Sequence, residues 1–317
     1  MNTASSTSGT ARIGISGWRY APWRGKFYPA GLVQREELAY AARTVRTIEI
    51  NGTFYALQRP VSFAHWHDAT PDDFVFSVKA PRLITHVKRL RDIDRPLANF
   101  LASGVFELRR KLGPILWQFP PSFRFDPARF EAFLAQLPRD TDAAQALARQ
   151  HDDFMSGREQ PRALHAQPLR HAVEIRHESF LDEAFVQMLR HHQVALVVAD
   201  TAGKWPYRED LTADFMYLRL HGDAELYASG YSDAALARWA RRIKSWQAGR
   251  QPRDAQLIST QHGPKAPARD LYCYFDNDVK VHAPFDALAL AGKLGQPHGL
   301  PDEAGFTIKP ARRAASG

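Results

Sequence analysis

Three short apolar segments carry a polar or charged residue at every second position. Side chains of a β-strand alternate between its two faces, so each segment would present its polar residues together on one face. These residues are Glu49 and Asn51, Glu174 and Arg176, and Arg219 and His221. A carboxylate serves as a general base, and imidazole titrates near neutral pH and serves as an acid or a base. We therefore predict Glu49, Glu174 and His221 as catalytic residues.

Cations and aromatic rings in similar positions indicate binding of an anion. Lys79, Arg176 and Arg219 would hold it, and Arg offers a bidentate geometry that Lys lacks. The loop at 17–29 interleaves aromatic and basic residues, which is typical either of a stacking platform for a sugar or base or of a packed lid with its rings inward. The residues predicted to bind substrate are Trp18, Asn51, Tyr55, Lys79, Gln118, Arg176, Asp200 and Arg219.

The same charges also fit a purely structural interpretation. Three carboxylates would face three cations, since Glu49, Glu174 and Asp200 balance Lys79, Arg176 and Arg219. Burying an unpaired charge costs several kcal/mol per ion, so an internal ion-pair network would show the same balance. The residues leave the site and the network open as alternatives.

Common cofactor and metal motifs are absent from the sequence. There is no dinucleotide or nucleoside-triphosphate glycine loop, no His-Glu-x-x-His helix and no Cys-x-x-Cys pair, so we predict no cofactor and no metal. A metal-dependent version remains open, with Glu49, Glu174, Asp200 and His221 as ligands. Three cations in the same place argue against it. The single Cys273 lies in an apolar segment, as a small buried side chain would.

Eight short apolar segments must position these residues, with helix-like segments between them. Such alternation is typical of parallel βαβ units, and eight of them predict an α/β protein with a (β/α)8 TIM barrel, a doubly wound open sheet being the alternative. Active sites of such barrels lie at the carboxyl ends of the strands. The expected strands lie at 13–15, 47–50, 74–78, 115–119, 172–176, 194–198, 216–220 and 271–275.

We expect one domain with an elaborated segment at 141–170, between the fourth and fifth strands, because the strand rhythm resumes unchanged after it. The barrel would span 12–296. Residues 1–11 would form a disordered N-terminal tail and residues 297–317 a C-terminal tail.

Composition is that of an ordinary globular protein. The 317 residues are 44% hydrophobic and 24% charged, which excludes disordered, collagen-like and disulfide-rich classes. No apolar stretch approaches the roughly 20 residues of a membrane span, and residues 1–10 do not resemble a signal peptide, so we predict a cytoplasmic protein without membrane contact. The formal charge of +8 permits an anionic partner, including a nucleic acid.

An ordered set of motifs resembles a known family. The motifs are Gly14-x-Ser16-Gly17-Trp18-x-Tyr20-x-x-Trp23, Glu49-x-Asn51-x-Thr53-Phe54-Tyr55, Phe76-x-Val78-Lys79-Ala80, Gln118-Phe119-Pro120-Pro121, Val173-Glu174-x-Arg176-His177, Tyr217-x-Arg219-x-His221-Gly222 and the strand at Tyr274-Phe275. Together, over about 13–290, they resemble the domain-of-unknown-function 72 family, also called YecE-like. The resemblance implies a TIM barrel and no particular activity. The family pattern has Asn-Asn after the last strand, where this chain has Asp276-Asn277, and an Asn-Ala pair where this chain has Asp286-Ala287.

The leading hypothesis is a TIM-barrel enzyme of hydrolase or isomerase type. Its substrate would be anionic, phosphate-bearing or nucleotide-derived, and would bind at the C-terminal mouth of the barrel. The alternatives are a non-enzymatic protein that binds a nucleic acid or a nucleotide, and the metal-dependent hydrolase or isomerase. The sequence does not choose among them, and it does not give the oligomeric state.

Overall fold

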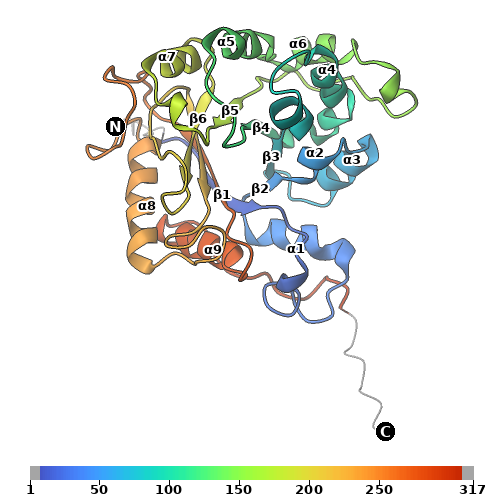
Figure 1. The fold of residues 1–317 in the computed structure, drawn as a ribbon. Helices are drawn as coiled ribbons and strands as arrows, with labels where there is room; N and C mark the ends of the chain where they lie inside the picture. The colour runs from blue at the N-terminus through green and yellow to red at the C-terminus, as the bar shows by residue number, and fades with distance from the viewer. Residues whose placement is uncertain (1–7, 309–317) are drawn as a thin grey trace, which may run out of the picture.

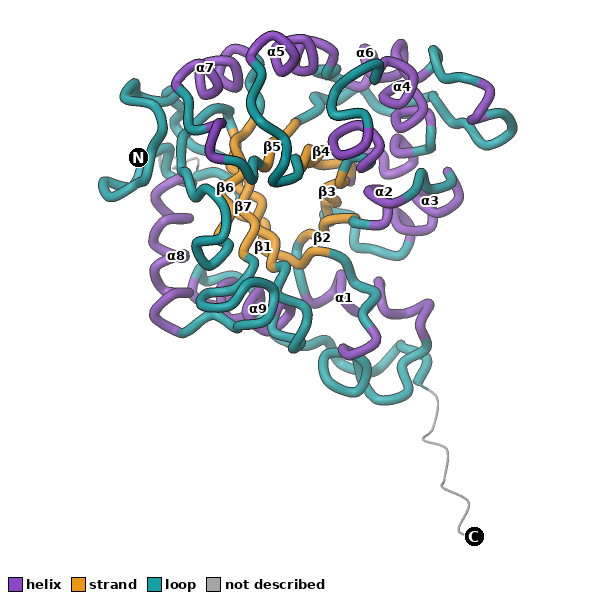
Figure 2. Tube along the Cα trace, in the orientation of Figure 1, coloured by secondary structure: helices purple, strands orange, loops and turns teal. Residues whose placement is uncertain are grey.

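A closed parallel barrel forms the centre of the computed structural model, which describes residues 8–308 (Figure 1, Figure 2). Each strand pairs with the next along the chain, and β1 closes the barrel against β8, with Ile15 beside Phe275. The strands are β1 (Ala11–Ser16), β2 (Thr47–Ile50), β3 (Val75–Lys79), β4 (Leu112–Gln118), β5 (His171–Glu174), β6 (Ala195–Asp200), β7 (Phe215–Leu220) and β8 (Asp270–Phe275). The predicted (β/α)8 barrel is confirmed, and the open sheet is not formed.

Helices surround the barrel in the tube view (Figure 2). They are α1 (Glu37–Thr44), α2 (Gly52–Tyr55), α3 (Pro60–Asp68), α4 (Asp94–Ala102), α5 (Pro127–Gln136), α6 (Thr141–Ala148), α7 (Glu183–His191), α8 (Asp233–Gln247) and α9 (Ala283–Lys293). Short 3-10 turns lie at Ala21–Trp23, Gln34–Glu36, Val105–Lys111, Asp153–Met155 and Glu178–Phe180, and a π-helical turn lies at Leu83–Val87. None of the described helices is both long and apolar enough to span a membrane.

Local chemistry sets several helix ends. The side chain of Asp126 accepts a hydrogen bond from the backbone N–H of Arg129 and so caps α5, while Ser232 caps α8 through Ala235. Gly104 ends the helical stretch of α4 with φ +101°, and a Cβ there would lie 2.4 Å from Cα of Pro60. A side chain therefore does not fit at that close approach.

The strands bury both of their faces. Leu196 and Val198 of β6 belong to the main core, between the barrel and the helices, whereas Val197 and Ala199 belong to a smaller cluster that also contains Tyr217. This second cluster fills the lower lumen. The polar side chains of the lumen lie above it, at the carboxyl ends of the strands.

The segment at 141–170 contains α6 and a 3-10 turn, and it returns to the barrel beside its own start. Thr141 donates its backbone N–H to the carbonyl of Gln167, and Asp140 forms a bridge with Pro168. The segment is therefore an elaboration of the β4–β5 connection.

Described residues of both expected tail segments contact the barrel domain. Ala11 already belongs to β1, and Gly9 and Thr10 pair with backbone or side-chain groups of the barrel; residues 1–7 lie outside the described residues. Near the other end, Ile308 forms a bridge with Leu32, and Phe306 packs on Tyr40. Residues up to 308 of the segment expected as a tail at 297–317 thus include apolar side chains that pack on the α1 region, and residues 309–317 lie outside the described residues.

Candidate functional site

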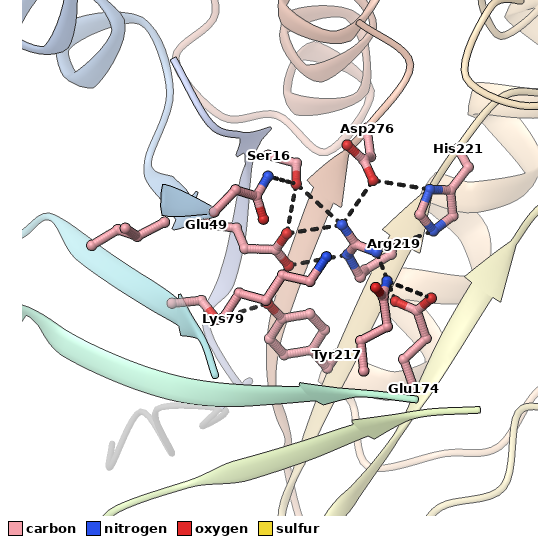
Figure 3. A network of polar contacts seen from close by, with 12 residues as sticks. Ser16, Glu49, Lys79, Glu174, Tyr217, Arg219, His221 and Asp276 are labelled. Atoms are coloured by element: carbon pink, nitrogen blue, oxygen red, sulfur yellow. Dashed lines mark hydrogen bonds and ion pairs between the residues drawn. The ribbon is translucent and has the colours of Figure 1, made fainter. Parts of the chain in front are cut away.

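Arg219 lies at the centre of a buried ion-pair network in the upper lumen (Figure 3). It comes from β7, and its side chain is 1% exposed. Its Nη2 lies 2.9 Å from Oε1 of Glu49 and 2.7 Å from Oδ2 of Asp276, and its Nη1 lies 2.7 Å from Oε2 of Glu174. Three carboxylates from three parts of the barrel thus surround one guanidinium, and the predicted role of Arg219 in binding an anion does not fit this arrangement.

Glu49 has both of its carboxylate oxygens occupied. Ser16 donates its hydroxyl to Oε1 at 2.5 Å, and Tyr217 donates its hydroxyl to Oε2 at 2.6 Å, in addition to the contacts from Arg219. Asn51 completes this side of the network by donating to the Ser16 hydroxyl at 2.9 Å. Glu49 is fully buried, so the structure gives it no free oxygen with which to accept a proton from a ligand.

Glu174 is buried in the same way. It accepts hydrogen bonds from Gln118 at 3.0 Å and from Arg176 at 2.8 Å as well as from Arg219. Burial opposes its ionisation, but the charges of Arg176 and Arg219 outweigh burial and hold the pKa of Glu174 well below its usual value. A carboxylate so stabilised is a poor proton acceptor, so Glu174 fits the network better than the predicted role of general base.

His221 lies beneath the surface of the site. Its Nδ1 is 3.1 Å from Oδ2 of Asp276, its Nε2 is 3.4 Å from Nη1 of Arg219, and its ring packs edge-on against Tyr227. The side chain is fully buried. His221 therefore supports Asp276 from behind, and it is not among the residues that line the cleft described next.

A cleft of about 570 Å³ opens above the network, at the carboxyl ends of the strands. This is the end of the barrel at which (β/α)8 enzymes bind their substrates. The cleft is lined by Tyr20, Asn51, Phe54, Tyr55, Lys79, Arg82, His86, Gln118, Arg176, Arg219, Tyr227 and Asp276. Six of the eight predicted binding residues thus lie in its wall, and Trp18 and Asp200 do not.

Lys79, the last residue of β3, is the buried charge of this site that has no polar partner in the described chain. Its Nζ lies 4.3 Å from the centre of the Phe54 ring, and it has no hydrogen-bond or ion-pair partner among residues 8–308. Thr53 fixes the backbone by donating its hydroxyl to the Lys79 carbonyl at 2.7 Å. Burial, together with the charge of Arg219, lowers the pKa of Lys79 to about 8.

Further cationic or basic groups flank Lys79. Arg176 stacks on Trp205 at 3.8 Å and approaches the Tyr227 hydroxyl at 3.3 Å, and its remaining N–H groups have no acceptor in the described chain. His86 comes from the π-helical turn after β3, and Arg82 lies immediately before that turn. Burial and the charges of Lys79 and Arg176 lower the pKa of His86 to about 4, so its ring is neutral at pH 7.

A second hollow of about 320 Å³ adjoins the cleft and shares Tyr20, Tyr227 and Asp276 with it. Asp278 also lines it. Burial opposes ionisation of Asp276, but the charge of Arg219 and the contact with His221 prevail and lower its pKa to about 2. Burial and the neighbouring charge of Asp276 hold the pKa of Asp278 well above its usual value. The mouth thus combines two carboxyl groups whose pKa values are shifted in opposite directions.

Two predicted binding residues lie elsewhere. Asp200 accepts a hydrogen bond from the Tyr231 hydroxyl at 3.2 Å, on the side of β6 that faces the helices, because it is in phase with Leu196 and Val198. Trp18 is 7% exposed and packs edge-on against Trp66, beside a separate hollow of about 250 Å³. The aromatic loop is therefore mostly a packed lid.

Six residues of the cleft wall were not predicted as site residues. They are Tyr20, Phe54, Arg82, His86, Tyr227 and Asp276. All lie in segments that follow strands, which form the mouth of a barrel, so their place after β1, β2, β3, β7 and β8 was the available signal. Asp276 was visible also as the departure from the family pattern.

The predicted metal ligands do not form one donor set. Asp200 lies on the outer face of β6, and Glu49 and Glu174 direct their oxygens to Arg219. Within the described residues, no group of three or more His, Cys, Asp or Glu side chains is arranged to hold a metal ion.

Comparison with known sequences gives consistent matches along nearly the whole chain. The family model described as protein of unknown function DUF72 matches residues 12–308. The chain is similar to the UPF0759 protein YecE of Escherichia coli O157:H7, with 27% identity over 237 residues, and to that of strain K12, with 28% identity over 240 residues. Each match covers 74% of this chain and 81% of the relative.

Solved structures give the same grouping. A DUF72 family protein from Thermotoga maritima MSB8 aligns with a TM-score of 0.66 and 26% identity, over 90% of this chain and all of the other. A DUF72 family protein from Enterococcus faecalis V583 aligns with a TM-score of 0.64 and 18% identity, over 92% of this chain and 98% of the other. The second likeness bears on the fold alone.

Proposed function

This chain belongs to the DUF72 family of TIM-barrel proteins, and from that premise we propose that its cleft binds a small anionic organic substrate and catalyses proton-transfer chemistry on it, of the isomerase or hydrolase type. The observation that carries the proposal is the charge of the cleft wall. Lys79 and Arg82 have no carboxylate partner in the described chain, and Arg176 has only Glu174. The one carboxylate in the wall, Asp276, is already bound to Arg219.

Such an arrangement favours an anion for a physical reason. A cation in a partly desolvated cleft has lost favourable interactions with water, and without a counter-ion nothing replaces them. A bound anion supplies the missing electrostatic interaction. Arg176 suits this role because its guanidinium plane is fixed by Trp205 and by Glu174 before any ligand arrives. The substrates that fit best carry a phosphate or a carboxylate group.

Groups that move protons lie in the same wall. The pKa of Lys79 at about 8 lets its amine accept a proton near neutral pH, whereas the pKa of His86 at about 4 leaves its imidazole neutral and only weakly basic. Tyr20 and Tyr227 also line the cleft, and the Tyr227 hydroxyl accepts a hydrogen bond from Arg176 at 3.3 Å. An anion site and proton-transfer groups are together sufficient for many isomerisations and hydrolyses of anionic substrates, without another cofactor.

The test is a binding screen on the full chain. Thermal shift followed by calorimetry would measure binding of inorganic phosphate, phosphosugars, carboxylates, nucleotides and short oligonucleotides, with Arg176→Ala as the test variant. Arg241→Ala, an exposed arginine on α8 far from the cleft wall, is the matched control. A hundredfold excess of ligand over Kd stabilises a protein by about 2.7 kcal/mol, which gives a readable shift.

We expect small anions to bind the protein and the Arg241→Ala variant alike, and to bind Arg176→Ala at least tenfold more weakly. Conversion of the ligands that bind would then be followed by NMR spectroscopy to test catalysis. Equal binding to all three proteins would refute the anion site. Binding of oligonucleotides alone, reduced by salt, would favour the nucleic-acid alternative instead.

A further inference from the structure

We propose that Lys79 forms a covalent imine with the carbonyl carbon of an anionic aldehyde or ketone bound in the cleft. This inference rests on the proposed function and names its substrate class. It starts from the position of the amine: Lys79 comes from the end of a barrel strand, lines the cleft and has no partner among residues 8–308.

A comparison within the chain shows what is unusual about this amine. Lys111 is also buried, and its ammonium group donates to the carbonyls of His67 and Thr70 at 2.6 and 2.8 Å. A lysine whose role is structural is satisfied in this way, because an ammonium group carries three donors. The side chain of Lys79 is almost as buried as that of Lys111. In the described chain, however, its ammonium group contacts only the face of the Phe54 ring.

The surroundings also favour the neutral, nucleophilic form of the amine. Burial and the nearby guanidinium of Arg219 lower the pKa of Lys79 to about 8. At pH 7 about a tenth of the side chain would then be neutral, compared with roughly one part in three thousand for an unperturbed lysine. The bond between Thr53 and the Lys79 carbonyl fixes the point from which the side chain extends.

The proposed step balances without another reactant. The neutral amine of Lys79 attacks the carbonyl carbon and forms a carbinolamine, whose hydroxyl group then leaves as water. Overall, one ammonium group and one carbonyl group give one protonated imine and one water molecule, so no oxidant or reductant is consumed. The positive imine withdraws electrons from the adjacent carbon and so acidifies its C–H bond, and the weakly basic, neutral imidazole of His86 in the same wall then accepts that proton.

The cleft also limits which carbonyl compounds would react. Arg176 and Arg82 would hold a phosphate or carboxylate group, and a volume of about 570 Å³ suits a small metabolite. The substrate class is therefore the phosphorylated aldehydes and ketones and the 2-oxo acids. A neutral aldehyde of the same length would lack the group that places its carbonyl carbon at Lys79.

Reductive trapping tests the inference. The full chain would be incubated with glyceraldehyde 3-phosphate, with pyruvate or with neutral glyceraldehyde, treated with sodium borohydride, and analysed by intact mass and by peptide mapping. Lys79→Arg keeps the charge and removes the nucleophile. Lys265→Arg, at an exposed position outside the cleft, is the matched control. Direct binding of the same three probes would be measured on all three proteins.

We expect one adduct per chain with an anionic probe, with a mass gain equal to that of the probe less one oxygen atom, located at Lys79 and formed at least tenfold faster than with neutral glyceraldehyde. Lys79→Arg would lose it, and Lys265→Arg would keep it. Anionic probes that bind without a trapped adduct at Lys79, or adducts spread over surface lysines, would overturn the imine while the anion site stands. An adduct at Lys79 that forms equally fast with neutral glyceraldehyde would keep the imine and overturn the anionic substrate class. Absence of both binding and trapping would overturn the proposed function as well.

Discussion

Replacing Arg219 by Met tests whether the lumen network holds the barrel together. The guanidinium contacts Glu49, Glu174 and Asp276, and the substitution would leave these three carboxylates with one cation fewer. Removing one partner of a buried ion pair destabilises a protein by about 3–5 kcal/mol, because the remaining charge stays buried. Ser16, Tyr217 and the other donors remain, so we expect a loss of about 4 kcal/mol in the free energy of unfolding at pH 7.

The loss of stability caused by Arg219→Met should depend on pH. In the protein itself the pKa values of Glu174 and Asp276 are lowered on folding, so the stability they provide is complete above their unfolded pKa values and is lost as the pH falls through the folded ones. Without Arg219 the pKa values of Glu174 and Asp276 would rise, because burial opposes their ionisation and the charge of Arg219 would no longer offset it. The penalty of the substitution should therefore shrink between pH 7 and pH 5, since the groups become neutral.

Urea denaturation followed by tryptophan fluorescence would measure both effects. Arg46→Met is the control, because Arg46 pairs with Asp73 in an exposed ion pair, and such pairs contribute about 0.2–1 kcal/mol. A loss for Arg219→Met no larger than that of the control, or a penalty that grows as the pH falls, would refute the network as the stabilising element.

Three further predictions concern single side chains. Lys79 should be acetylated by acetic anhydride with a rate that rises through pH about 8. A rate at Lys79 that does not rise around this pH in peptide mapping would contradict its lowered pKa. Asp200→Asn should leave anion binding unchanged. It should leave thermal stability at pH 7 equal or slightly higher, because burial raises the pKa of Asp200 and its charged form therefore destabilises the fold. Loss of anion binding in calorimetry would show instead that Asp200 belongs to the site. Gly222→Ala should lower the melting temperature by several degrees, since Gly222 has φ +130° and a Cβ there would lie 2.3 Å from the Glu225 carbonyl oxygen. An unchanged melting temperature would show that the loop adapts to the added methyl group.

The sequence predicted the barrel because its signals are local. Alternation along a strand placed Glu49 and Arg219 on the lumen side, and closure of the barrel made them neighbours although 170 residues separate them. The resemblance to the family gave the same fold. The balance of three carboxylates against three cations was also predicted, with one substitution: Asp276 takes the place that was assigned to Asp200.

That error has a physical cause. Asp200 ends a strand whose two faces are both apolar, since Val197 and Ala199 fill the lumen while Val198 packs under the helices. The position of Asp200 at a strand end therefore could not show which face its carboxylate occupies. Alternation along β6 places Asp200 on the same face as Val198, toward the helices. Whether a charged side chain in the lumen is exposed to solvent depends on the loops above it. The alternation of residues within the strands carries no information about those loops.

The structure joins the two alternatives that the sequence left open, because the network and the cleft are layers of one electrostatic arrangement. The carboxylates of Glu49, Glu174 and Asp276 lie in the deeper layer and turn toward Arg219. Arg176 and Lys79 line the cleft above them; Arg176 donates one N–H group to Glu174, and the Lys79 ammonium group lies over the Phe54 ring. The negative charge of the deeper carboxylates offsets part of the desolvation penalty of these cations, but none of the carboxylates contacts the Lys79 amine directly. An anion that binds from solvent would therefore complete an interaction that folding leaves incomplete, and this is why we place the chemistry at Lys79 and assign the better-bonded Glu49 and Glu174 to its support.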